Sequence, residues 1–255
     1  DKGGKIVVIS RSEYISKISN HLDNNDLFDR LPSRTNPRLN TRNAILRQTE
    51  TFIEKSGMKK SVITPTPDTC SESKPYALIK LHKPDRPARI IVPACGTVVE
   101  KLSKLLHTYL LPIDSTLPYR YRSSHQFLTE LDTLDAQHSY LGSLDVTALY
   151  DHVKIENFLD ILPTLLEKYA CLLNAAHPFY NFSTQEIVCI SKAIFTAPVI
   201  SFNGHFYRQK SGVPMGNPAS KKYRSRPKTE QGKCDNFSGV EASYTIIGIV
   251  GLLAL

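Results

Sequence analysis

The sequence predicts an α/β protein of the α+β type, in which α-helices are combined with short strands. Residues 97–111 repeat apolar side chains with the period of an amphipathic helix. Residues 199–209 join two strand-like runs through Asn203-Gly204, the dipeptide that type I′ hairpins prefer. The 255 residues are 41% hydrophobic and 22% charged, which is typical of a globular protein and excludes wholesale disorder, collagen and a multi-span membrane protein.

The N-terminal part of the chain alternates predicted elements with irregular segments. The apolar run KIVVI (5–9) predicts a short strand, and SEYISKISNHL (12–22) predicts a helix that starts at Ser12. Residues 31–43 are rich in Pro, Asn and Arg, and residues 61–75 form a second irregular segment. These two segments are candidate subdomain boundaries.

Two helices are expected in the middle of the chain. Thr97 and Glu100 form a capping box at the start of the helix over 97–111, and Pro112 is expected to stop it. A second helix is expected from 124 to about 134. The apolar face of the first helix should carry Val98, Leu102, Leu105, Leu106 and Tyr109.

The following segments predict a strand and further helices. Residues 140–150 (YLGSLDVTALY) alternate apolar and polar side chains, which predicts a half-buried strand with Asp145 on its polar face. Helical patterning resumes over about 154–173, with an interruption expected at Pro163, and again after a capping box at 183–186.

The C-terminal part begins with a loop of small residues and ends in a segment of different character. Residues 209–220 (QKSGVPMGNPAS) hold two glycines and two prolines, which lets a ligand approach the backbone closely. From residue 221 the chain is basic, and residues 245–255 are wholly apolar. That apolar run is shorter than the roughly 20 residues that span a bilayer, so a cut-off membrane segment is an alternative that we do not favour.

Charge and cysteine usage narrow the classes of partner and compartment. The formal net charge is +8, and residues 74–104 alone contribute seven basic and two acidic side chains. A polyanionic partner fits this balance. The five cysteines are scattered without a C-x-x-C pair, which favours a reducing, intracellular compartment, nuclear or cytoplasmic. The chain starts at Asp1 without an initiator Met, so we expect a fragment.

Four motifs occur in a fixed order along the chain. They are a basic segment (75–106) containing K-L-H-K, the run SLDVTALYDHV (143–153), the hairpin FNGHFYRQ (202–209) and the loop SGVPMGNPAS (211–220). In this order they resemble the motifs of reverse transcriptases, most closely those of Penelope-like retroelements, which carry D-V-x-x-L-[FY] and F-N-G-x-F-Y-x-Q leading into G-x-x-M-G-x-P-x-S. The resemblance covers residues 1–220.

The resemblance implies a right-hand polymerase fragment with fingers and an incomplete ferredoxin-like palm sheet. Residues 1–60 would be an N-terminal flanking region, 61–220 the fingers and partial palm, and 221–255 an unrelated tail that we expect to be disordered. The implied activity is RNA-directed DNA polymerisation, a nucleotidyl transfer between two divalent cations. RNA template, DNA primer and deoxynucleoside triphosphates are the implied partners, with neither a membrane partner nor an oligomer indicated.

The resemblance also implies roles for individual residues. Asp145 would be a catalytic ligand of Mg²⁺ (or Mn²⁺), with the Val146 carbonyl as a further ligand. Tyr150 would pack under the incoming sugar and exclude a 2′-hydroxyl, and Asp151 is interpreted as a helix cap. The remaining substrate-binding residues would be Lys80, Lys83 and Arg89 on the triphosphate, and Gln209, Gly212, Met215 and Gly216 against the template and incoming base.

Each of these residues also has a purely structural interpretation. Asp145 could cap a strand, Tyr150 could be a core aromatic, the basic segment could be a solvated face, and the glycines could form a tight turn. The chain also departs from the family: Ile90 follows Arg89 where relatives have Pro, and no adjacent Asp pair occurs anywhere in the sequence. We therefore expect a chain that does not polymerise DNA, with a non-catalytic RNA- or DNA-binding relic as the alternative.

Overall fold

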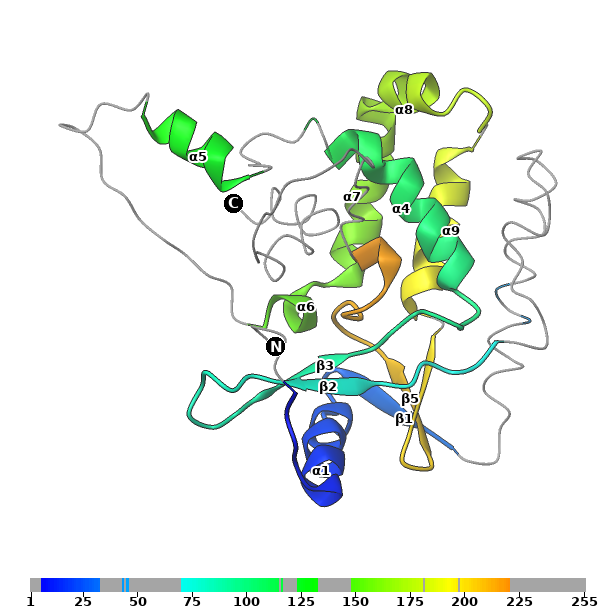
Figure 1. The fold of residues 1–255 in the computed structure, drawn as a ribbon. Helices are drawn as coiled ribbons and strands as arrows, with labels where there is room; N and C mark the ends of the chain where they lie inside the picture. Colours follow the sequence, from blue (N-terminus) through cyan, green and yellow to red (C-terminus); the bar gives the residue numbers. More distant parts are fainter. Residues whose placement is uncertain are drawn as a thin grey trace.

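The computed structural model describes residues 6–32, 43, 45, 70–114, 116, 123–132, 148–180, 182–196 and 198–220. Within these ranges, helices combine with two small antiparallel sheets, so the predicted α+β class is confirmed. Figure 1 shows helices gathered above the strands, while the N-terminal helix lies below them.

Five short strands of the described ranges form two antiparallel sheets. The first sheet has the order β1-β5-β4, and the second is the β2–β3 hairpin. The strands are β1 (Phe28–Leu31), β2 (Tyr76–Ile79), β3 (Ala88–Ile91), β4 (Val199–Phe202) and β5 (His205–Gln209). The predicted hairpin of β4 and β5 is confirmed, because Asn203 and Gly204 have φ values of 46° and 78°, as a type I′ turn requires.

The segment before β2 links the two sheets. The Ser73 N–H donates to the Val199 carbonyl at 2.9 Å, and the Ser201 N–H donates to the Ser73 carbonyl at 2.9 Å. These bonds form an isolated parallel bridge between Ser73 and Ile200 on β4. The sequence in this segment predicted only a loop, because a single bridge leaves no periodic pattern.

The N-terminal helix packs against both sheets and builds the smaller of two cores. Helix α1 spans Arg11–Leu22 and starts one residue before the predicted Ser12, because the Ser10 side chain accepts the Glu13 N–H at 3.1 Å and acts as the N-cap. The buried members of this core, here called the sheet core, are Ile18, Leu22, Phe28, Ile90, Val92, Ile200 and Tyr207.

The predicted strand at 5–9 is wrong for its described part. Residues 6–10 have no regular secondary structure, and the side chains of Ile6 and Val8 are 94% and 90% exposed. An apolar run becomes a strand only where a neighbouring strand pairs with it. Among the described strands none pairs with this segment.

The larger core, here called the helical core, lies between four helices. They are α4 (Glu100–Asp114), α7 (Ile155–Lys168), α8 (Ala170–Ala176) and α9 (Thr184–Thr196). The other helical elements of the described ranges are α5 (Ser124–Leu131), α6 (Leu149–His152) and the 3₁₀ turn η1 (Pro218–Ser220). Figure 1 shows α4 and α9 side by side, with α8 across one end.

Helix α4 follows the predicted face but not the predicted ends. The apolar face is confirmed, with Leu102 and Leu106 almost fully buried in the helical core. Thr97, however, donates its N–H and its hydroxyl to the Ala94 carbonyl at 3.1 and 2.6 Å, which forms a turn and delays the helix to Glu100. Pro112 lies inside the helix, which continues to Asp114 because burial of Ile113 holds the last turn.

The second predicted interruption is also misplaced. Pro163 lies inside α7, where the flanking Leu162 and Leu166 are buried in the helical core. The break falls instead at Tyr169, which separates α7 from α8. The predicted capping box of α9 is confirmed, because the Ser183 N–H donates to the Glu186 carboxylate at 2.8 Å and the Glu186 N–H donates to the Ser183 hydroxyl at 3.3 Å.

Several predictions fall on residues outside the described ranges. They are the end of the helix over 124–134, most of the strand over 140–150, most of the two irregular segments, and the tail over 221–255. Where the chain is described, no helix has both the length and the apolar character needed to cross a membrane. The cysteines placed in these ranges, Cys70, Cys95, Cys171 and Cys189, are free thiols.

Candidate nucleic-acid interface

The β2–β3 hairpin has one face toward α1 and one face away from it. Arg89 pairs with Leu78 across the hairpin, and the Lys80 N–H extends the ladder to the Pro87 carbonyl at 3.0 Å. Because side chains alternate along a strand, Lys80 and Arg89 share a face with Ile91. The opposite face carries Ile90, which packs in the sheet core with α1. The two basic side chains therefore lie on the face that α1 leaves open.

Three basic side chains at this hairpin lie within electrostatic reach of one another. The pKa of Lys80 is lowered by partial burial and by the positive charges of Arg89 and Lys83. Lys83 is exposed, whereas Lys80 and Arg89 are half-buried. Like charges held together in this way favour an anion that neutralises them. We call Lys80, Lys83 and Arg89 the basic cluster.

A loop rich in glycine, residues 211–217, packs against the end of β3. The Val92 N–H donates to the Met215 carbonyl at 2.7 Å, and the Ala94 N–H donates to the Gly216 carbonyl at 3.4 Å. Gly216 has φ of 125°, and a Cβ there would lie 2.8 Å from the Val92 carbonyl oxygen. Only glycine permits this approach. The glycine loop is thus hydrogen-bonded to the residues that follow the strand carrying Arg89.

The other side of the glycine loop packs against α6. The Val213 N–H donates to the Tyr150 carbonyl at 2.7 Å. A Cβ on Gly212, which has φ of 75°, would lie 2.6 Å from the Tyr150 carbonyl oxygen and 2.9 Å from the Cα of Asp151. The glycine loop therefore lies between β3 and α6 and brings the basic hairpin and Tyr150 to one region of the molecule.

Gln209 supports the glycine loop from within. Its side chain is 8% exposed, and its Nε2 donates to the Ser211 carbonyl at 3.0 Å. The N–H groups of Lys210 and Ser211 both donate to the Leu27 carbonyl, at 2.9 and 3.3 Å. The glutamine predicted to contact template is therefore also a structural anchor of the loop, and Leu27, which no sequence pattern marked, is its second anchor.

Helix α6 carries both Tyr150 and Asp151, and it places Asp151 differently from the prediction. Asp151 is not a helix cap: it lies within α6, its N–H donates to the Ala148 carbonyl at 2.9 Å, and Ala148 occupies the cap position with φ of 48°. Burial lowers the pKa of His21, and the negative charge of Asp151 acts in the opposite direction and raises it. The Tyr150 ring is half-buried against the helical core, as its alternative structural interpretation expected.

The structure does not describe the residues that were predicted to bind metal ions. Asp145 and Val146 lie outside the described residues. In the part of the chain that is described, no three His, Cys, Asp or Glu side chains come close enough to hold a metal ion. The sequence also has no adjacent Asp pair, so the carboxylates among the described residues do not fit a two-metal centre.

Comparison with known proteins gives no further support for a function. No family model, no curated protein and no solved structure matches the chain. The features that bear on function are therefore the motifs and the arrangement of the basic cluster, the glycine loop and Tyr150.

Proposed function

We propose that this chain is the fingers and partial palm of an RNA-directed DNA polymerase, similar to the reverse transcriptases of Penelope-like retroelements, and that it binds nucleic acid without polymerising it. One observation carries the proposal. The basic cluster, the glycine loop and Tyr150 lie far apart in the sequence, yet two backbone hydrogen bonds of the loop, Val92 to Met215 and Val213 to Tyr150, join their elements.

The chemistry of this region suits a phosphate backbone. Arg89 offers a planar fork of donors and the two lysines offer mobile point charges, and both kinds of group bind phosphate oxygens. The glycines of the loop let its backbone pack closely against β3 and α6, which holds the basic cluster and Tyr150 in one region. Tyr150 supplies an aromatic ring on the far side of the same loop, in the position of the proposed sugar contact.

We do not propose catalysis for this chain, because of the metal ligands that catalysis would need. Mg²⁺ prefers hard carboxylate oxygens, and two cations at catalytic spacing need more than one carboxylate. Asp145 is the single carboxylate that the resemblance assigns to this task. We therefore assign polyanion binding to this chain and derive no transfer step for it.

A filter-binding titration over salt concentration tests the proposal. With a single-stranded RNA as probe, the logarithm of the binding constant should fall linearly with the logarithm of salt concentration, with a slope of about −0.7 per phosphate contacted. Replacing Lys80, Lys83 and Arg89 together by Met should make this slope shallower by up to about 2. A salt-independent affinity would refute phosphate-dominated binding.

A matched triple variant controls for net charge. Lys104, Lys168 and Lys192 are exposed on the helices of the helical core, and their replacement by Met removes the same three charges. We expect the control to keep the wild-type slope. Equal loss in both variants would mean that binding follows total charge rather than this site.

Primer extension separates the proposed binder from an active polymerase. With Mg²⁺ or Mn²⁺ present, the wild-type chain and an Asp145→Asn variant should both bind a primed template and extend it equally little. Extension by the wild-type chain that is lost in Asp145→Asn would show an active enzyme and overturn the non-catalytic part of the proposal.

A further inference from the structure

The loop between β2 and β3 is built from two successive turns. The Lys83 N–H donates to the Lys80 carbonyl at 3.2 Å, and the Arg86 N–H donates to the Lys83 carbonyl at 3.1 Å. Lys83 therefore stands where the two turns meet, and its position depends on both. Arg86 closes the second turn with φ of 41°, a left-handed conformation that is unfavourable for a non-glycine residue.

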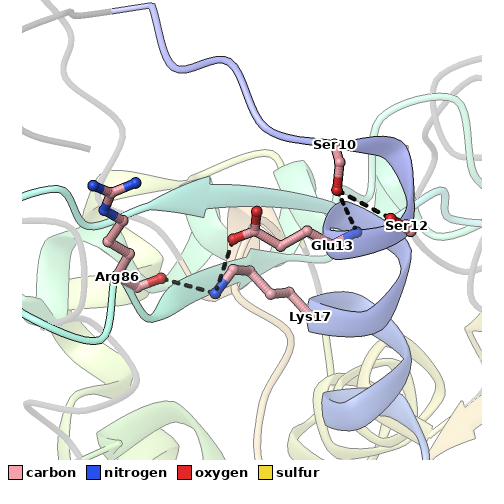
Figure 2. A network of polar contacts seen from close by, with 5 residues as sticks. All are labelled: Ser10, Ser12, Glu13, Lys17 and Arg86. Carbon is pink, nitrogen blue, oxygen red and sulfur yellow. Dashed lines mark hydrogen bonds and ion pairs between the residues drawn. The ribbon is translucent and has the colours of Figure 1, made fainter.

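A side chain from α1 holds this loop at Arg86. The Lys17 Nζ donates to the Arg86 carbonyl at 3.1 Å, across 69 residues of sequence. The same Nζ lies 3.6 Å from the Glu13 carboxylate, one helical turn earlier. Figure 2 shows both contacts converging on the Lys17 ammonium, while the Arg86 guanidinium extends to the other side of the loop. Lys17 thus binds the backbone of the loop and leaves its basic side chains available.

Helix α1, which carries Lys17, is itself held in place by buried side chains and hydrogen bonds. Ile18, the residue after Lys17, is fully buried in the sheet core together with Ile90 of β3. Three residues before Lys17, the Tyr14 hydroxyl accepts the Ala77 N–H of β2 at 3.4 Å. The start of the helix is fixed by the Ser10 cap on Glu13. Helix α1 therefore contacts the hairpin at two places, strand β2 and the loop between β2 and β3.

We propose that Lys17 is a positioning residue of the candidate nucleic-acid interface: by fixing the Arg86 carbonyl it holds the loop that presents Lys80 and Lys83 to a phosphate backbone. This inference rests on the proposed function. The physical basis of this role is preorganisation. A loop that is already fixed in its binding geometry loses less conformational entropy when the polyanion binds.

Single substitutions at Lys17 test the inference with the RNA probe. Lys17→Met removes the donor and the charge, and it should weaken RNA binding roughly fivefold. Lys17→Arg keeps both and should retain the wild-type affinity within about twofold. Lys192→Met removes one exposed charge on α9 and serves as the charge control. The side chain of Lys17 lies outside both cores, so Lys17→Met should lower the urea midpoint by no more than the loss of one surface hydrogen bond and ion pair. Lys17→Arg and Lys192→Met should keep the wild-type midpoint.

Two readouts separate positioning from direct contact. Since Lys17 binds a carbonyl rather than a phosphate, Lys17→Met should keep the wild-type salt slope, whereas Lys83→Met should make the slope shallower by about 0.7. In the free protein, Lys17→Met should also speed hydrogen exchange of the Arg86 amide, which closes the second turn. Lys17→Arg should leave that exchange rate unchanged.

The outcomes distinguish this inference from the proposed function. If Lys17→Met and Lys192→Met bind RNA equally well, or if exchange at Arg86 is unchanged, Lys17 does not position the loop and the inference fails while the proposed function stands. A shallower salt slope in Lys17→Met would make Lys17 a phosphate contact and would also overturn the positioning role. If the wild-type chain binds no RNA at all, the proposed function fails and this inference fails with it.

Discussion

Gly212 is the residue on which the approach of the glycine loop to α6 depends most directly. A Cβ there would lie 2.6 Å from the Tyr150 carbonyl oxygen, and its φ of 75° is unfavourable for any L side chain. We predict that Gly212→Ala lowers the free energy of unfolding by about 2 kcal/mol or more, because backbone atoms cannot move aside cheaply. Urea unfolding at constant m-value measures this loss.

Gly204 provides the matched control for this prediction. It has nearly the same φ, 78°, but a Cβ there would meet nothing within 4 Å. Gly204→Ala should therefore cost only the conformational part, about 1 kcal/mol. Equal losses at the two positions would mean that the contact with Tyr150 does not matter.

Lys80 should make polyanion binding depend on pH. Its pKa is lowered by burial and by Arg89 and Lys83, below the ordinary lysine value of 10.5. A bound polyanion favours the protonated amine, so the complex holds more protons than the free protein while pH rises through the lowered pKa. Affinity for the RNA probe should therefore fall with rising pH before it would for an ordinary lysine.

Lys80→Arg checks the origin of this pH dependence. Arginine stays charged throughout the accessible range, so the variant should bind with a flatter pH profile on the alkaline side. A profile identical to that of the wild-type chain would assign the effect to another group.

At the scale of the element, the capping box of α9 is the clearest local signal that the structure realises. Ser183 and Glu186 exchange hydrogen bonds of 2.8 and 3.3 Å at the start of the helix. Ser183→Ala should cost about 1 kcal/mol of stability, because the Glu186 N–H loses its acceptor. Thermal unfolding should place Ser183→Thr close to the wild type, and a loss of similar size in both variants would argue against the hydroxyl as the cause.

Elements were predictable from sequence where their cause is local. The Asn203-Gly204 turn and the Ser183 cap depend on residues within a few positions of one another, and both are confirmed. Pro112 and Pro163 were expected to end helices because proline lacks an N–H and crowds the preceding turn. Burial of neighbouring apolar side chains outweighs this cost in both helices, and the sequence alone does not show which side chains become buried.

The residue types of the candidate interface were predictable from the sequence. Its supports, meaning the contacts that hold its loops in place, were not. The sequence marked Lys80, Lys83 and Arg89 through charge and the glycine loop through composition. The supports are contacts between distant segments, such as the Lys17 ammonium with the Arg86 carbonyl and the Leu27 carbonyl with the loop. A carbonyl acceptor leaves no trace in residue type, so periodicity and motifs could not reveal these contacts.

At the scale of the whole molecule, the two cores are joined by segments that pass from one to the other. Val92 belongs to the sheet core and Ala94, two residues later, to the helical core. The chain passes from one core to the other a second time, between Tyr207 of β5 in the sheet core and Val213 of the glycine loop in the helical core. These crossings predict that the cores unfold together, since neither can lose its packing without moving the shared backbone.

A cavity in the helical core should therefore destabilise the sheets as well. Leu106 is 1% exposed, and Leu106→Ala should lower the free energy of unfolding by about 3 kcal/mol. Native-state hydrogen exchange should show equal losses of protection at Ile194 in α9 and at Tyr207 in β5. Leu128→Ala removes a leucine side chain from a position that is 55% exposed and should change neither amide. Loss of protection confined to Ile194 in Leu106→Ala would show that the helical core opens on its own, and the nucleic-acid interface would then join two independently unfolding units.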